Sequence, residues 1–169
     1  WYIMDFETLS ITMYTDPDLV HEINEAVLDW TLQVLRLAAE EGGIDCVQIS
    51  DDWGGTHSLL ISPDDFRTFF MPYFRRLVQG IKDLGVPVIM HNDGRIWDVL
   101  DELVDCGIDA LHPVERAAGM DLKIVKEKYN GHLVPIGNIN NKITMSSPNP
   151  EDIKNEVLEC IKEAGLNGG

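Results

Sequence analysis

The sequence predicts an α/β protein built around a parallel β-sheet. Short, almost continuously apolar segments recur four times along the 169 residues, and each is followed by a segment whose apolar residues have helical spacing. Strands that are apolar along their whole length are typical of parallel sheets buried on both faces. The pattern therefore predicts four parallel strand–helix units after one leading helix, in a single domain over residues 1–169.

The helices are predicted from their ends as well as from their spacing. Asp16 followed by Pro17 is a typical helix start, and Gly42-Gly43 ends that helix. Ser62-Pro63-Asp64-Asp65 is a capping box for the next helix, in which Pro72 predicts a kink or two abutting helices. Later helices are expected over residues 96–104 and 121–129 and from Pro150 to Ile161. The apolar face expected for the leading helix consists of Leu19, Val20, Ile23, Val27, Trp30, Val34, Leu35 and Ala38.

Each of the four predicted strands ends in polar residues. The strands are expected over residues 44–50, 86–90, 108–111 and 132–136. The residues that follow them are Asp51-Asp52, His91-Asn92-Asp93, His112-Pro113-Val114-Glu115 and Gly137-Asn138. Because parallel α/β proteins gather their catalytic groups at the carboxyl ends of the strands, one site is expected at this edge. His91 and Asp93 are expected to face one cavity, since residues i and i+2 of an extended segment point the same way.

Purely structural roles are also open for these residues. Asp93 would cap the next helix, and Asn138 would hydrogen-bond its own turn. The remaining structural roles are loop capping by Asp51 and Asp52, loop packing by Trp53 and His57, a core position for His91, an ion pair of Glu115 with Arg116 or Lys123, and a structural place for His112.

Composition excludes several classes of partner. A net charge of −16 and a pI near 4.4 argue against nucleic acids and anionic membrane surfaces. No apolar run is long enough to span a membrane, and residues 1–10 lack the pattern of a signal peptide. Cys46, Cys106 and Cys160 are odd in number and widely spaced, which favours reduced thiols and a cytoplasmic location. Neither GxGxxG nor GxxxxGK[ST] is present, so nucleotide binding has no support.

Four segments together resemble the uroporphyrinogen decarboxylase superfamily: DDWGGTHSLLISPDDFRTFFMPYFRRLV, VIMHNDGRI, GIDALHPVERAAGMDLKIVKEKY and VPIGNINNK. The resemblance covers roughly residues 16–169, and their order and spacing make it more specific than any single motif. Members are single (β/α)8 TIM barrels longer than this chain. The resemblance therefore implies a partial barrel, truncated at both ends, which would not fold independently.

The superfamily contains two kinds of chemistry. One is decarboxylation of uroporphyrinogen in porphyrin (haem) biosynthesis, which needs neither metal nor cofactor. The other is methyl transfer between a corrinoid protein and an acceptor such as a thiol or a folate. Thiol-directed methyltransferases bind zinc through a His-x-Cys-Gly at the strand end that is occupied here by His91-Asn92-Asp93-Gly94. Decarboxylases usually lack this histidine, so His91 and Glu115 bring the chain closer to the methyltransferase-like branch.

The favoured interpretation is a metal-dependent, methyltransferase-like enzyme. Asp52, His91 and Glu115 are the expected catalytic residues, and His91, Asp93 and Glu115 are the expected metal ligands. Zinc is the first candidate metal, although a carboxylate in place of the family's cysteine makes the site harder and better suited to oxygen-bound substrates or another metal.

The expected substrate-binding residues are Asp51, Trp53 and Asn138. The resemblance also implies a small-molecule substrate, a corrinoid carried by a partner protein, and a homodimer, because the family often forms dimers. The alternative function is a cofactor-free uroporphyrinogen decarboxylase, in which Asp52 would stabilise a positively charged pyrrole intermediate. An excess of 29 acidic over 13 basic residues counts against that polyanionic substrate.

Overall fold

The computed structural model describes residues 3–165, and its contacts divide the chain into two compact units. The first unit combines residues 1–47 with 61–87, and the second combines residues 48–60 with 88–169. Residues 166–169, at one of the two ends where the barrel was expected to be truncated, lie outside the described residues. The candidate site lies entirely within the second unit, so the two units are described separately.

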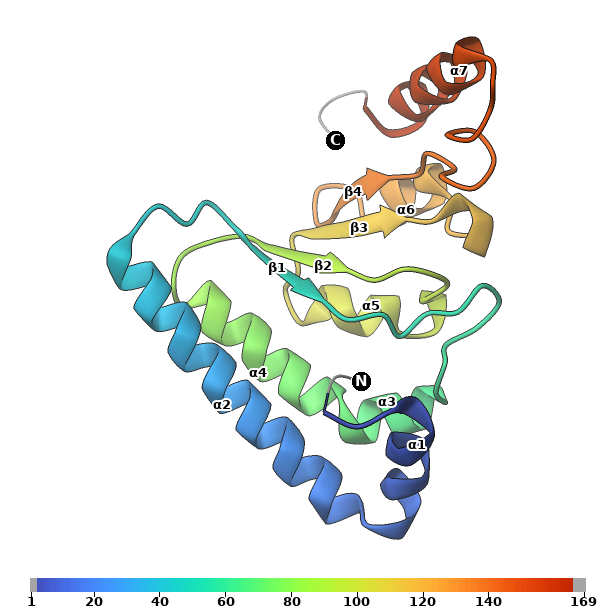
Figure 1. Cartoon of the computed structure of the whole chain (residues 1–169). Helices are drawn as coiled ribbons and strands as arrows, with labels where there is room; N and C mark the ends of the chain where they lie inside the picture. Colours follow the sequence, from blue (N-terminus) through green and yellow to red (C-terminus); the bar gives the residue numbers. More distant parts are fainter. Residues whose placement is uncertain (1–2, 166–169) are drawn as a thin grey trace. The chain divides into compact units, whose positions relative to one another are not determined.

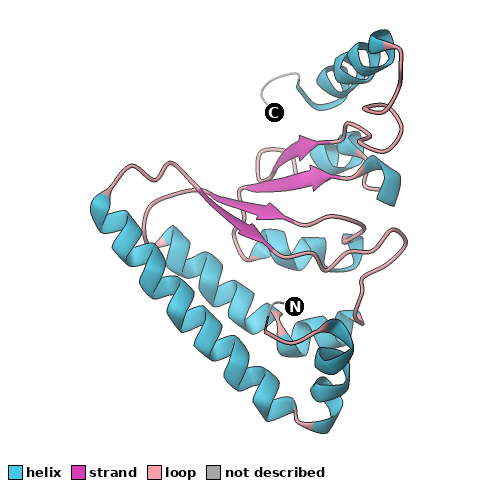
Figure 2. Cartoon of the chain, viewed as in Figure 1, coloured by secondary structure: helices cyan, strands magenta, loops and turns pink. Residues whose placement is uncertain are grey.

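The first unit is helical (Figures 1 and 2). It contains α1 (Phe6–Thr15), α2 (Pro17–Glu41), α3 (Pro63–Phe69) and α4 (Met71–Lys82). The prediction of a single leading helix was incomplete, because α1 precedes α2. A hydrogen bond from the Thr8 N–H to the Asp5 carboxylate caps α1, but the helix lacks a clear apolar stripe and so gave little periodic signal.

The predicted helix ends are confirmed in this unit. Asp16 caps α2 and Pro17 begins it, while Gly42 ends it with φ +80°. Ser62 caps α3 by accepting the Asp65 N–H at 3.0 Å. Pro72 divides the predicted long helix into the abutting helices α3 and α4, because a proline lacks the N–H that a continuous helix would need.

The predicted apolar face of α2 was wrong in large part. Val20 and Leu28 are buried, whereas the Trp30 side chain is 67% exposed. The contact between α2 and α4 uses polar groups as well, including a paired hydrogen bond between Glu25 and Arg76 at 2.6 and 2.7 Å. The apolar periodicity located α2 correctly, but the position of α4 against it determines which side of α2 is buried.

The second unit holds a four-stranded parallel sheet in the order β1-β2-β3-β4 (Figure 1). The strands are β1 (Val47–Ser50), β2 (Val88–His91), β3 (Ala110–Val114) and β4 (Val134–Gly137). The helical elements are α5 (Trp97–Asp105), the 3₁₀ turn η1 (Arg116–Ala118), α6 (Leu122–Lys128), α7 (Pro150–Cys160) and the π-helical turn η2 (Ile161–Gly165). The predicted α/β class and the alternation of strands and helices are confirmed, and the sheet does not close on itself.

The core of this unit lies against the two inner strands. Val88, Met90 and Leu111 are fully buried, together with Leu100 and Leu103 of α5. The prediction of strands buried on both faces holds for β2 and β3 better than for β1 and β4, whose residues are partly exposed. The reason is position, since β1 and β4 are the two edges of an open sheet.

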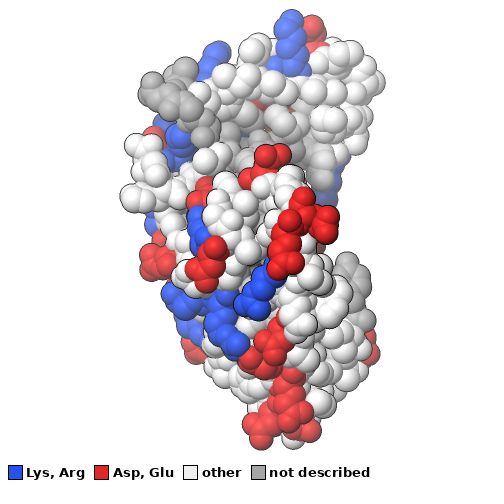
Figure 3. Space-filling model, turned by 90° about the vertical axis from the view of Figure 1, so that its left-hand side faces the viewer, with Lys and Arg blue, Asp and Glu red and all other residues white. Residues whose placement is uncertain are grey.

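Two general predictions can be compared with the structure, and the charged side chains can be seen on its surface. The three cysteines are free, in agreement with the expectation of reduced thiols. In the part of the chain that the structure describes, no helix has both the length and the apolar character that crossing a membrane requires. Acidic side chains lie next to Lys and Arg side chains on the face drawn in Figure 3.

Candidate functional site

The loop after β1 is hydrogen-bonded to the last residue of β2 and to the residues after it. The Asp51 N–H donates to the His91 carbonyl at 3.1 Å, and the Trp53 N–H donates to the Asn92 side-chain oxygen at 2.6 Å. The Asp93 N–H donates to the Asp52 carboxylate at 2.9 Å. These bonds hold two segments together that are far apart in the sequence, so the two strand ends form one structure.

Two glycines allow this close approach. A Cβ on Gly54 would lie 2.5 Å from the Asp93 carbonyl oxygen, and a Cβ on Gly94 would lie 2.5 Å from the Gly54 carbonyl group. Gly94 also has φ +83°, which residues with side chains rarely adopt. Gly54 of DDWGG and Gly94 of HNDG are therefore needed because the two backbones touch.

The side chains of Asp52, His91 and Asp93 converge at this edge. One potential ligand atom from each of the three lies within 4.8 Å of the others. The His91 Nε2 is 3.7 Å from the Asp52 Oδ1, and the His91 side chain is 24% exposed. His91 and Asp93 therefore lie close together, and Asp52 joins them from the neighbouring strand end. The expectation that His91 and Asp93 face one cavity stays a prediction, because, of these three residues, only Asp93 lines the cavity at this edge.

The His91 ring contacts His112 through Nδ1, on the side away from the Nε2 that faces Asp52. The register of β2 and β3 places the two residues side by side, and their Nδ1 atoms are 2.7 Å apart. Burial lowers the pKa of His112, and the neighbouring His91 lowers it further, while Asp93 opposes this shift. His112 was given a structural role from the sequence, and its contact with His91 was not foreseen.

Glu115 does not join the group of potential ligands around His91 within the described residues. Its carboxylate accepts the Gly94 N–H at 2.8 Å, and its other oxygen is 3.9 Å from the Lys142 amine. Glu115 thus braces the turn that carries Asp93. Whether it also binds a metal remains a prediction.

Asp51 and Trp53 lie in the β1 loop as predicted, and they contact each other. Burial raises the pKa of Asp51 to about 6, against an opposing hydrogen bond from the Trp53 side chain, and the nearby Asp52 raises it further. Trp53 is only 5% exposed. Its predicted contact with substrate is untested, and its burial gives it a packing role in the loop.

Asn138 is buried and its amide is already bonded to the protein. Its amide nitrogen donates to the carbonyl oxygens of Val114 and Met120 at 2.7 and 2.9 Å. Its side-chain oxygen accepts from the Arg116 guanidinium at 3.0 Å. Asn138 has φ +73°, a conformation that asparagine tolerates better than most residues. These bonds join the ends of β3 and β4, while its predicted role in binding substrate remains untested.

A cavity of about 400 Å³ opens beside these residues. Its wall includes Asp93, His112 and Glu115, and another part of it is formed by the end of β4 and the segment after it, residues 137–142. The two basic groups on this wall lie near carboxylates: Arg116 is paired with Glu163 at 2.9 Å, and the largely exposed Lys142 lies 3.9 Å from Glu115. Arg116 was not among the site residues predicted from the sequence, because its partners are distant along the chain.

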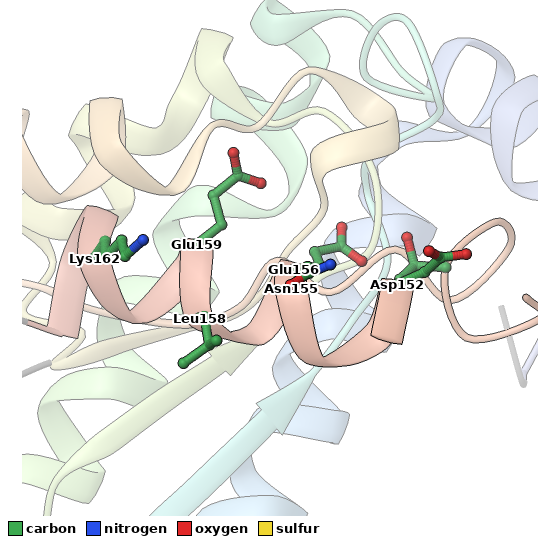
Figure 4. A pocket seen from close by; sticks show the side chains of 7 residues that line it. Asp152, Asn155, Glu156, Leu158, Glu159 and Lys162 are labelled. Atoms are coloured by element: carbon green, nitrogen blue, oxygen red, sulfur yellow. The ribbon is translucent and has the colours of Figure 1, made fainter. Parts of the chain in front are cut away.

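A second pocket lies along α7 (Figure 4). It is lined by Thr144 and by residues of α7 and the turn after it, including Asp152, Glu156 and Glu159. Apart from Thr144 its wall comes from one helical segment, and no strand end contributes to it. The cavity at the strand ends is therefore the stronger candidate for chemistry.

Comparisons with known proteins agree with the fold. Curated uroporphyrinogen decarboxylases from Chlorobaculum tepidum and Ralstonia pickettii are each 27% identical to the chain, over 90% and 98% of its length. The chain spans only 41% and 43% of those two proteins. A methyltransferase from Methanosarcina mazei has a TM-score of 0.74 at 23% identity, covering 95% of this chain and 45% of its own, which shows a shared fold.

The family itself is established by a match along the whole chain. The model of the family described as uroporphyrinogen decarboxylase (URO-D) matches residues 1–169. The match includes the strand ends that carry Asp52, His91 and Glu115. The chain therefore belongs to the uroporphyrinogen decarboxylase family, as its motifs implied.

Proposed function

We propose that this chain carries the metal site of a methyl-transferring enzyme, with Asp52, His91 and Asp93 as the ligands. The observation that supports this most strongly is the convergence of their three ligand atoms within 4.8 Å at the carboxyl edge of the sheet. This differs from the expected set of His91, Asp93 and Glu115 in one member, because Asp52 is closer to His91 than the sequence indicated.

The donor set fits a divalent cation. One imidazole nitrogen and two carboxylates form a hard site, and the two negative charges balance a doubly charged ion. Three protein ligands leave a position open for substrate, as in catalytic zinc sites. When bound, such a metal would act as a Lewis acid and lower the pKa of an acceptor hydroxyl or thiol.

The chain's own residues would position this chemistry. The Asp93 N–H holds Asp52 in place through its carboxylate, and Glu115 holds the Gly94 turn behind Asp93. The cavity beside Glu115 would receive the acceptor, while a corrinoid carried by a partner protein would supply the methyl group. A hard, oxygen-rich site favours an acceptor that meets the metal through oxygen.

Electrostatics favour this proposal over decarboxylation of a polyanionic tetrapyrrole. Such a substrate would need free arginine and lysine side chains in its pocket. On the described cavity wall, Arg116 faces Glu159 and Glu163, and Lys142 faces Glu115. The cavity therefore offers little uncompensated positive charge.

Uroporphyrinogen decarboxylase activity is the second candidate. It is favoured by the curated relatives, which carry that name at 27% identity. In this case no metal is needed, and the exposed Asp52 carboxylate would stabilise a positive charge on a pyrrole ring.

Metal content and two activity assays on the full-length protein distinguish the candidates. We expect about one divalent metal ion per chain by elemental mass spectrometry, lost in His91→Ala and retained in His132→Ala, a control at an exposed histidine outside the site. We also expect the protein to demethylate methylcobalamin when an acceptor is added, and the visible absorption spectrum of the corrinoid measures this reaction. Release of CO₂ from uroporphyrinogen by a metal-free protein would overturn the proposal and establish the second candidate.

A further inference from the structure

We infer that His112 is a positioning residue that sets the tautomer and ring orientation of His91 for metal binding. This inference rests on the proposed function, since it concerns how one proposed ligand is held. His112 lies in the middle of β3 and is not one of the proposed ligands.

The sheet itself creates the contact. His91 is the last residue of β2, and the parallel register pairs it with His112 of β3. The ring centroids are 4.9 Å apart with an interplanar angle of 31°, and the two Nδ1 atoms are 2.7 Å apart. At that separation the nitrogens form a hydrogen bond, which requires a proton on one and a lone pair on the other.

The position of Asp52 determines the direction of this bond in the metal-bound state. The His91 Nε2 points toward the Asp52 carboxylate at 3.7 Å, so Nε2 is the atom available for a metal ion. A neutral imidazole that binds metal through Nε2 carries its proton on Nδ1. His91 then donates through Nδ1 and His112 accepts through its own Nδ1, which leaves the proton of His112 on Nε2.

A histidine acceptor suits this site electrostatically. Metal-binding histidines usually donate their second N–H to a carboxylate, a carbonyl or water, and this bond orients the ring. Here Asp52 and Asp93 already supply two negative charges within 4.8 Å of the His91 ligand atom. A neutral imidazole orients His91 without adding a third charge to the group.

Zinc affinity of variants of the full-length protein tests the inference. His112→Phe keeps a flat ring but removes the acceptor, and we expect its affinity for Zn²⁺ to fall about 10–100-fold in competition with a chromophoric chelator. His112→Asn can place an amide oxygen near the position of Nδ1, so its affinity should lie close to that of wild type. His132→Ala is the control for loss of an exposed histidine.

The outcomes separate this inference from the proposed function. If wild type binds zinc and His91→Ala does not, but His112→Phe binds as tightly as wild type, the positioning role is overturned and the proposed site stands. If wild type binds no zinc, or His91→Ala binds it unchanged, the proposed site fails and the inference fails with it.

A second test uses the wild-type protein alone, so its result does not depend on whether a variant folds. Long-range ¹H–¹⁵N spectra of histidine-labelled, zinc-loaded protein report the tautomer of each ring. We expect His91 protonated at Nδ1 and His112 protonated at Nε2. A proton on Nδ1 of His112 would overturn the inference, even where zinc binding itself is confirmed.

Discussion

Gly94→Ala tests whether contact between the β1 and β2 loops holds the site together. Gly94 has φ +83°, and a Cβ there would lie 2.5 Å from the Gly54 carbonyl carbon and oxygen. A side chain in the left-handed region costs about 1–2 kcal/mol. Forcing an extra carbon against packed atoms costs about 1–3 kcal/mol more. The free energy of unfolding should therefore fall by about 2–5 kcal/mol.

Two other glycines separate these contributions. Gly131 has φ +78° but nothing within 4 Å of its Cβ position, so Gly131→Ala measures conformational strain alone. Gly54 lies outside the left-handed region, and its Cβ would meet the Asp93 carbonyl oxygen at 2.5 Å, so Gly54→Ala measures the steric contact alone.

Urea denaturation of the full-length variants compares the three losses. We expect Gly94→Ala to lose more stability than either of the others, and to lose zinc affinity because the loops must separate and move Asp52 away from His91. Equal losses for Gly94→Ala and Gly131→Ala would refute the steric argument.

Three smaller predictions concern hydrogen bonds around the sheet and the first helices. The hydrogen bond from Lys128, followed by that from Tyr129, holds the pKa of Asp101 below its usual value, so its stabilisation is present at neutral pH and is lost as pH falls through that lowered pKa. Because Asp101 is largely exposed, Asp101→Asn should cost at most about 1 kcal/mol at pH 7 and less at acidic pH, where Asp101 becomes protonated. Denaturation at both pH values checks this, and an equal cost at both would contradict it. Asn138→Ala should cost about 2–4 kcal/mol in urea denaturation, because two buried carbonyls lose their donor and alanine is strained at φ +73°. Asn138→Gly should cost somewhat less, since glycine adopts this φ without strain, and a cost under about 1 kcal/mol for it would refute the contribution of these hydrogen bonds. Ser62→Ala should lower stability by about 1 kcal/mol in thermal denaturation through loss of the α3 cap, and an unchanged midpoint would contradict it.

The roles of the site residues were harder to predict than their place. Asp52, His91 and Glu115 were all expected at the carboxyl edge because each follows an apolar strand, and the structure puts them there. Which of them meet depends on side-chain reach across neighbouring strands. Asp52 lies beside His91, whereas Glu115 turns to the Gly94 amide.

Strand ends were also displaced from the prediction. Each strand ends one to three residues later than its apolar run, except β1, which ends at Ser50 as expected. The polar His91 and His112 belong to strands because backbone hydrogen bonds continue past the last apolar side chain. The apolar pattern of the sequence shows which residues are buried, whereas hydrogen bonds between neighbouring strands decide where a strand ends.

The sequence alone determined the local features of this protein. Asp16-Pro17, Ser62-Pro63 and Pro72 set the helix boundaries, because caps and prolines act on hydrogen bonds within one turn of the chain. The alternation of apolar strands and helices indicated the parallel α/β class, because helices that follow each strand must cover the apolar faces of the sheet.

Tertiary structure determined everything that depends on pairs of distant residues. The contact of His91 with His112 follows from the register between β2 and β3, and the contact of Gly54 with Gly94 follows from the packing of two loops. Register and packing are set by the sum of many weak contacts across the sheet, which no single stretch of sequence contains.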